Sequence, residues 1–146
     1  NQDNLKTFSA KYGAEITSLD AIYDVDCDIY APCALGATLN TENINRLKCS
    51  VISGAANNQL ADENIHGKML TEKGILYAPD FLINAGGLIN VYSELHGYNR
   101  EMALEHTKQI YNTTLEIFKK AKTENLTTVE AAKKIADERI LAARRK

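Results

Sequence analysis

The sequence lacks the long apolar run that a membrane-spanning helix needs. No stretch approaches the roughly 18 consecutive apolar residues that cross a bilayer. It also lacks a charged start followed by an apolar stretch and a small-residue cleavage site, so no secretory signal is predicted. The formal net charge is only -2, without the basic excess that binds nucleic acid or acidic lipid. We therefore expect no membrane and no nucleic acid as a partner.

Cysteine is also scarce. Cys27, Cys33 and Cys49 are odd in number and no pair has C-x-x-C spacing, so no metal site is predicted. Cys27 and Cys49 lie in apolar runs and are expected to be small core residues. This usage fits a reducing, cytoplasmic location. The chain begins at Asn1 without a methionine, so we expect a processed product or a recombinant fragment.

Short β-rich runs alternate with helix-like stretches in the first part of the chain. Strands are predicted at 27–30, 49–52 and 75–77, and a weaker one at 14–16. Residues 1–12 and 62–73 predict helices, each followed by a glycine. Their apolar faces are expected to consist of Leu5, Phe8 and Tyr12 in the first helix and of Ile65, Met69 and Leu70 in the second. This alternation favours an α/β fold with a parallel sheet.

From residue 88 onward the pattern is helical. Helices are predicted at 88–96, at 100–122 and from Thr127, where Thr127 to Glu130 fits a capping box. Two inward stripes are expected, namely Ala103, Thr107, Ile110, Tyr111, Thr114 and Phe118, and then Val129, Ala132, Ile135, Ala136 and Ile140.

Four polar loops follow the predicted strands, at 31–37, 53–59, 78–80 and 84–87. Ligands of open α/β sheets bind at the carboxyl ends of the strands, and asparagine side chains suit a carboxamide or an amino-acid head group. However, asparagine and glycine are common in ordinary loops. None of the eight glycines forms the G-x-G-x-x-G signature of dinucleotide folds. Spacing alone leaves a cofactor site and ordinary turns both open.

The amino-acid sequences of these loops resemble those of one protein family. The segments 26–36, 54–60, 77–91 and 94–100 are similar to leucine dehydrogenases of the Glu/Leu/Phe/Val dehydrogenase family, in the same order and over essentially the whole chain. The resemblance implies an incomplete Rossmann NAD-binding domain at 1–87, without its glycine-rich first βαβ unit. It implies that the C-terminal helices of 88–146 pack on this domain and, in the full protein, toward a substrate domain.

Family membership implies oxidative deamination of an L-amino acid to a 2-oxo acid, ammonia and NADH. Leucine, valine and isoleucine are the expected substrates, and a homo-oligomer is expected for the full-length enzyme. The resemblance places the catalytic lysines and aspartate in an N-terminal domain that this sequence lacks, so no catalytic residue is expected here and the fragment alone is expected to be inactive. The lysines are expected to be surface charges, and the three histidines surface or packing residues. Cys33 is expected to be a neighbour of the cofactor and not a nucleophile.

The resemblance assigns binding roles to six residues of this sequence. Ala34, Ala56 and Asn57 match cofactor-binding positions, and Asn84 matches a contact to the substrate head group. Leu88 and Val91 match the substrate side-chain pocket, although core packing is the alternative for both. The glycines at 86–87 either aim helix amides at the substrate carboxylate or only form a tight turn.

Two rival functions stay open from the sequence. One is another substrate class within the family, such as phenylalanine, valine or glutamate. The other is a non-catalytic nucleotide-binding module, which would require that the gene encode these residues alone.

Overall fold

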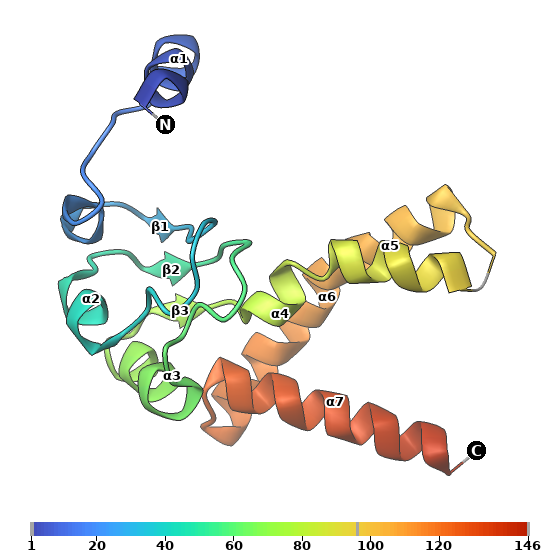
Figure 1. The fold of residues 1–146 in the computed structure, drawn as a ribbon. Coiled ribbons are helices and arrows are strands. Elements are labelled where there is room, and N and C mark those ends of the chain that lie inside the picture. The colour runs from blue at the N-terminus through green and yellow to red at the C-terminus, as the bar shows by residue number, and fades with distance from the viewer. Residues whose placement is uncertain (1, 96, 146) are drawn as a thin grey trace.

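The computed structural model describes residues 2–95 and 97–145, and it has three short parallel strands followed by a helical C-terminal part (Figure 1). The strands β1 (Ile29–Tyr30), β2 (Val51–Ile52) and β3 (Leu76–Tyr77) lie in the order β1-β2-β3. Ile29 pairs with Val51, which pairs with Leu76. The predicted α/β fold is confirmed, with shorter strands.

The weaker strand predicted at 14–16 is wrong. These residues form an irregular link between α1 (Gln2–Tyr12) and the 3-10 helix η1 (Ala21–Asp24). A short extended segment becomes a strand only when a neighbour satisfies its backbone groups, and β1 pairs only with β2 in the described chain. Figure 1 shows α1 apart from the sheet, and Leu5, Phe8 and Tyr12 on it are exposed. The predicted face therefore exists, but it stays exposed in the part of the chain that the structure describes.

The core lies between the sheet and the helices α2 (Thr41–Arg46) and α3 (Glu63–Glu72). Its buried members are Leu39, Ile44, Leu47, Cys49, Ile52, Leu60, Leu70, Ile75, Tyr77 and Val129. Cys49 is confirmed as a core residue, and half-buried Cys27 packs against this cluster.

The inward face of α3 differs from the prediction. Leu70 is buried and Met69 packs against the core, as predicted, but Ile65 is exposed and His66 is buried in addition. The imidazole tolerates burial because the Asp62 backbone N–H donates to its Nδ1 at 2.8 Å and its Nε2 lies 3.2 Å from the Thr41 hydroxyl. His66 is thus a packing residue, as expected.

After β3 the chain is helical. The elements are α4 (Asp80–Ile83), α5 (Gly86–Leu95), α6 (Arg100–Glu124) and α7 (Thr128–Arg144). Helix α5 begins two residues before its predicted start, and His96, its predicted last residue, lies outside the described residues. The capping box is confirmed, because the Glu130 N–H donates to the Thr127 hydroxyl and the Thr127 N–H donates to the Glu130 carboxylate.

Both predicted stripes of α6 and α7 are partly wrong. Tyr111, Ala136 and Ile140 are exposed, whereas Ile117 and Ala121 are buried. The buried residues of α7 lie in its first half, near its connection to α6 at Asn125, where the two helices pack. Beyond Ile135 the predicted apolar positions of α7 have no cover within the described chain, so periodicity alone overextended the buried face.

Candidate functional site at the carboxyl edge of the sheet

The loops after β1 and β2 are packed tightly against each other. The Ala56 N–H donates to the Pro32 carbonyl at 2.9 Å, and the Ala37 N–H donates to the Asn58 carbonyl at 2.7 Å. A Cβ atom built on Gly54 would lie only 2.7 Å from the carbonyl carbon of Pro32, so this position admits no side chain. The two loops therefore form one rigid edge.

Two asparagines predicted for different roles meet at this edge. Asn57 is exposed in the loop after β2, and half-buried Asn84 caps the C-terminus of α4, just after β3. The Asn84 Nδ2 donates to the Asn57 Oδ1 and lies 3.4 Å from the Ala55 carbonyl oxygen. The fold thus brings together the residue predicted to contact cofactor and the residue predicted to contact substrate.

The other two predicted cofactor positions differ in exposure. Ala34 is exposed on the loop after β1, next to exposed Cys33, whose sulfur accepts from the Ala55 N–H at 3.4 Å. The side chain of Ala56 is buried and its N–H is already used by Pro32. A ligand at this edge would therefore meet Ala34 and Asn57 directly, with Ala56 behind them.

The first turn of α5 is open. The backbone φ of Gly87 is not in the left-handed region, and a Cβ atom built there would have no neighbour within 4 Å. Leu88 and Val91 are 72% and 56% exposed, so neither is a core residue of this chain. The first N–H groups of a helix have no intrahelical acceptor, so this turn offers free donors beside an uncovered aliphatic surface.

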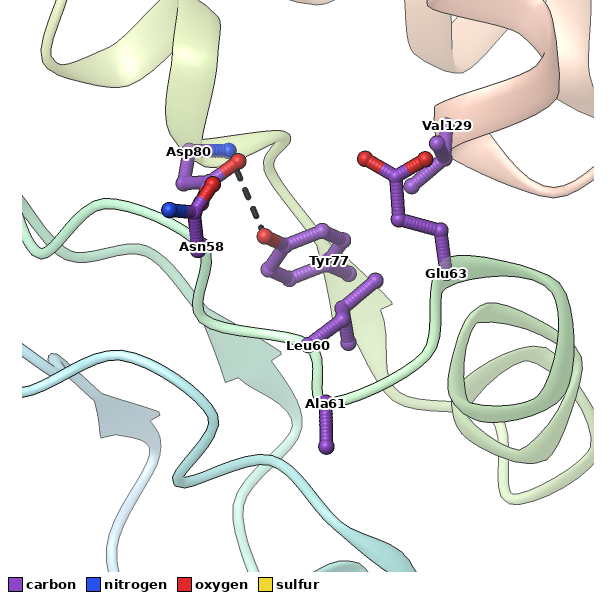
Figure 2. A pocket seen from close by; sticks show the side chains of 7 residues that line it. All are labelled: Asn58, Leu60, Ala61, Glu63, Tyr77, Asp80 and Val129. Carbon is purple, nitrogen blue, oxygen red and sulfur yellow. Dashed lines mark hydrogen bonds between the residues drawn. The ribbon is translucent and has the colours of Figure 1, made fainter.

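Sequence reasoning gave no role to two residues behind the asparagines. Gln59 is fully buried and Asp80 is 8% exposed. With Tyr77, Asp80 lines a cavity of about 210 Å³ between β3, the start of α3 and α7 (Figure 2). The Asp80 N–H donates to the Tyr77 hydroxyl at 3.3 Å, and burial, followed by the charge of Asp80, raises the pKa of Tyr77. The signal that was available is a carboxylate placed directly after a buried strand and a proline.

The described residues form neither a metal centre nor a membrane span. No group of three or more His, Cys, Asp or Glu side chains is placed to hold a metal ion across 2–95 and 97–145. Within the same ranges, no helix is long and apolar enough to cross a membrane.

A parallel sheet with polar loops at its carboxyl edge, followed by helices, defines a partial Rossmann-type α/β domain. The family model for Glutamate/Leucine/Phenylalanine/Valine dehydrogenase matches residues 1–146. The chain belongs to this dehydrogenase family.

Relatives within the family carry different substrate names. A leucine dehydrogenase from Thermoactinomyces intermedius is 54% identical over 96% of this chain and 38% of its own length. An L-tryptophan dehydrogenase from Nostoc punctiforme is 50% identical over 98% of this chain and 41% of its own. The crystal structure of the Nostoc punctiforme L-tryptophan dehydrogenase matches with a TM-score of 0.96 at 46% identity, over 100% of this chain and 44% of that one. The chain thus spans about two fifths of the length of these relatives.

Proposed function

We propose that this chain is the NAD-binding part of an L-amino-acid dehydrogenase that oxidatively deaminates leucine, valine and isoleucine. The observation that carries the proposal is the meeting of Asn57 and Asn84 at the carboxyl edge, beside an open helix start. A flat ring laid against Ala34 and Asn57 would have its carboxamide within reach of an amide side chain. When bound, the nicotinamide supplies a hydride acceptor.

Different residues bind the cofactor and orient the substrate. Asn57 binds and orients the cofactor, and Asn84 orients the amino-acid head group beside it. The free N–H groups at the start of α5 favour the substrate carboxylate. Gly87 supports this role, because glycine in a helix costs up to about 1 kcal/mol relative to alanine and nothing in the described chain requires it there. Space for a ligand is the remaining physical reason for a glycine.

The aliphatic pair on α5 sets the substrate preference. Leu88 and Val91 lie three residues apart on one helix and so share a face. Neither offers a partner for a carboxylate, and burying an unpaired carboxylate is costly, so glutamate is excluded. Branched aliphatic side chains match this surface.

A second candidate is an aromatic amino acid. The Nostoc punctiforme L-tryptophan dehydrogenase shares this fold with a TM-score of 0.96. Tyr92 and Leu95 continue the exposed apolar surface of α5 beyond Val91, so a longer side chain has a surface to contact. The two candidates differ in how far the substrate extends along α5.

The test is steady-state kinetics of the full-length protein with NAD or NADP. The substrates are leucine, valine, isoleucine, phenylalanine, tryptophan and glutamate. We expect kcat/KM to be highest for a branched-chain substrate with NAD, and glutamate to be inactive. A preference for tryptophan or phenylalanine would favour the second candidate, and no cofactor reduction with any amino acid would reject the proposal.

The 146-residue chain alone serves as the comparison. We expect it to produce no NADH from leucine, because it lacks the family's lysine-bearing domain and with it half of the cleft. We also expect weak or absent NAD binding by calorimetry, because the chain has no glycine-rich turn to hold the pyrophosphate.

A further inference from the structure

We infer that Asp80 and Gln59 are positioning residues that hold the two asparagines of the site in register. The inference rests on the proposed function of Asn57 and Asn84. Gln59 is fully buried and Asp80 nearly so, so each acts through the backbone that carries an asparagine. Asp80 begins α4, which Asn84 caps at its other end, and Gln59 ends the loop that holds Asn57.

The Asp80 carboxylate joins these two segments. Its Oδ2 accepts from the Gln59 backbone N–H at 2.9 Å, and its Oδ1 accepts from the Phe81 backbone N–H at 2.8 Å. One oxygen therefore holds the loop after β2, and the other holds the first turn of α4. Hydrogen bonds to an ionised group are shorter and stronger than neutral ones, which suits a fixed joint.

The Gln59 side chain shapes the same loop from inside. Its Nε2 donates to the Gly54 carbonyl at 2.7 Å and to the Ala56 carbonyl at 2.9 Å. Its Oε1 is buried and has no hydrogen-bond partner in the described part of the chain, so the two donations alone fix the amide. Gly54 and Ala56 precede Asn57, which means that one buried side chain sets the path of the backbone that presents Asn57.

These contacts close a ring. Asp80 holds the Gln59 end of the loop, Gln59 holds the Gly54 and Ala56 carbonyls, and the Asn57–Asn84 hydrogen bond closes the outer side. Hydride transfer depends on the relative placement of cofactor and substrate, and a shift of about 1 Å can cost about 100-fold in rate. The ring is placed to prevent such a shift.

Substitutions of unchanged size test the ring in the full-length protein. Asp80→Asn supplies one acceptor oxygen where two backbone N–H groups need acceptors, so its NH₂ must face a donor. Gln59→Glu removes both donors and places a carboxylate against two carbonyls. Thr127→Val is the matched control, because Thr127 is also a buried polar residue that accepts from a backbone N–H, at the N-cap of α7.

The kinetic readout separates positioning from stability. We expect all three variants to lower Tm, and we expect Asp80→Asn and Gln59→Glu to lower kcat of the folded enzyme by about 10- to 100-fold. Thr127→Val should leave kcat within about twofold, since it only removes a helix cap. If Asp80→Asn and Gln59→Glu changed kcat no more than this control, they would be structural residues and the inference would fail.

A structural readout keeps the test independent of the reaction. In a crystal structure of Asp80→Asn or Gln59→Glu we expect the Asn57 Oδ1 to Asn84 Nδ2 hydrogen bond to be broken. An unchanged Asn57–Asn84 contact in both variants would overturn the inference. A wild-type protein without dehydrogenase activity would instead reject the proposed function, while this measurement still decides the positioning role.

Discussion

The two sides of the candidate site differ in how far residues of this chain pack against them. The loops at 31–37 and 53–59 are packed backbone to backbone, with Gly54 admitting no side chain and Gln59 fully buried. The first turn of α5 is the opposite, since Gly87 has open space around it and Leu88 is 72% exposed. The closed side, formed by the loops 31–37 and 53–59, is packed within this chain. The open side, the first turn of α5, presents its groups to a ligand or to another part of the full-length protein.

The largest effect is expected on the closed side. Gly54→Ala should lower the free energy of unfolding by about 3 kcal/mol, because the new methyl group must displace the backbone of Pro32. Chemical denaturation of the full-length variant measures this loss. Near-wild-type stability would mean that the two loops separate easily and that the closed side is not rigid.

The open side should respond in specificity. Leu88→Val removes one methylene from an exposed position and should enlarge the proposed substrate pocket, so kcat/KM for leucine should rise relative to valine. One methylene is worth about 1–3 kcal/mol in such a pocket, which is about tenfold or more. Leu141→Val, at another exposed leucine but on α7, is the matched control and should leave the ratio unchanged. An unchanged or lowered leucine-to-valine ratio in Leu88→Val would show that Leu88 does not shape the pocket.

The boundary between the two sides is the asparagine pair. Asn57→Ala should mainly raise KM for NAD, and Asn84→Ala should mainly lower kcat on the amino acid. Because the two side chains are hydrogen-bonded, a double-mutant cycle in kcat/KM should give a coupling energy of about 1 kcal/mol. If both single variants changed only the NAD term, the division of roles would be wrong, and additive effects would show that the hydrogen bond carries no energy.

The smallest effect separates stability from activity at one position. Gly87→Ala should stabilise the protein by up to about 1 kcal/mol, since alanine favours a helix and, apart from the adjoining helix backbone, no described atom lies within 4 Å of its Cβ position. The same change should lower kcat/KM by crowding the substrate carboxylate. Thermal unfolding and kinetics of one preparation measure both signs. Unchanged activity would leave the glycine without a ligand-binding reason.

Local signals were predicted well from the sequence. The capping box at Thr127 depends on residues within one turn, and the three strands are marked by short apolar runs. Features that depend on distant partners were missed. Residues 14–16 have strand-like chemistry without a neighbouring strand, and Ile65 lost the inward position to His66 because the imidazole finds two hydrogen-bond partners there.

At the candidate site, too, contacts between residues distant in the sequence were not predicted. The loops were located by their composition, and Asn57 and Asn84 were assigned by resemblance, but their mutual contact spans 27 residues. The Asp80 carboxylate accepts from the backbone N–H of Gln59. Every residue except proline carries such an N–H, so no side-chain pattern in the sequence predicts this hydrogen bond. The surroundings of the Asp80 carboxylate also come from distant segments, because Glu63 and Val129 line the same cavity.

The close approach of Gly54 to Pro32 also bears on recombination between family members. The loops 31–37 and 53–59 are shaped to each other through backbone atoms, and Gly36 likewise lies against the Asn57 carbonyl oxygen, 2.7 Å from where its Cβ would be. A chimera that takes only one of these loops from a relative would contain a loop whose backbone is shaped to the relative's other loop, which the chimera lacks. The two loops are therefore a single unit of exchange, although α2 and β2 separate them in the chain, and grafts designed to change cofactor use should carry both.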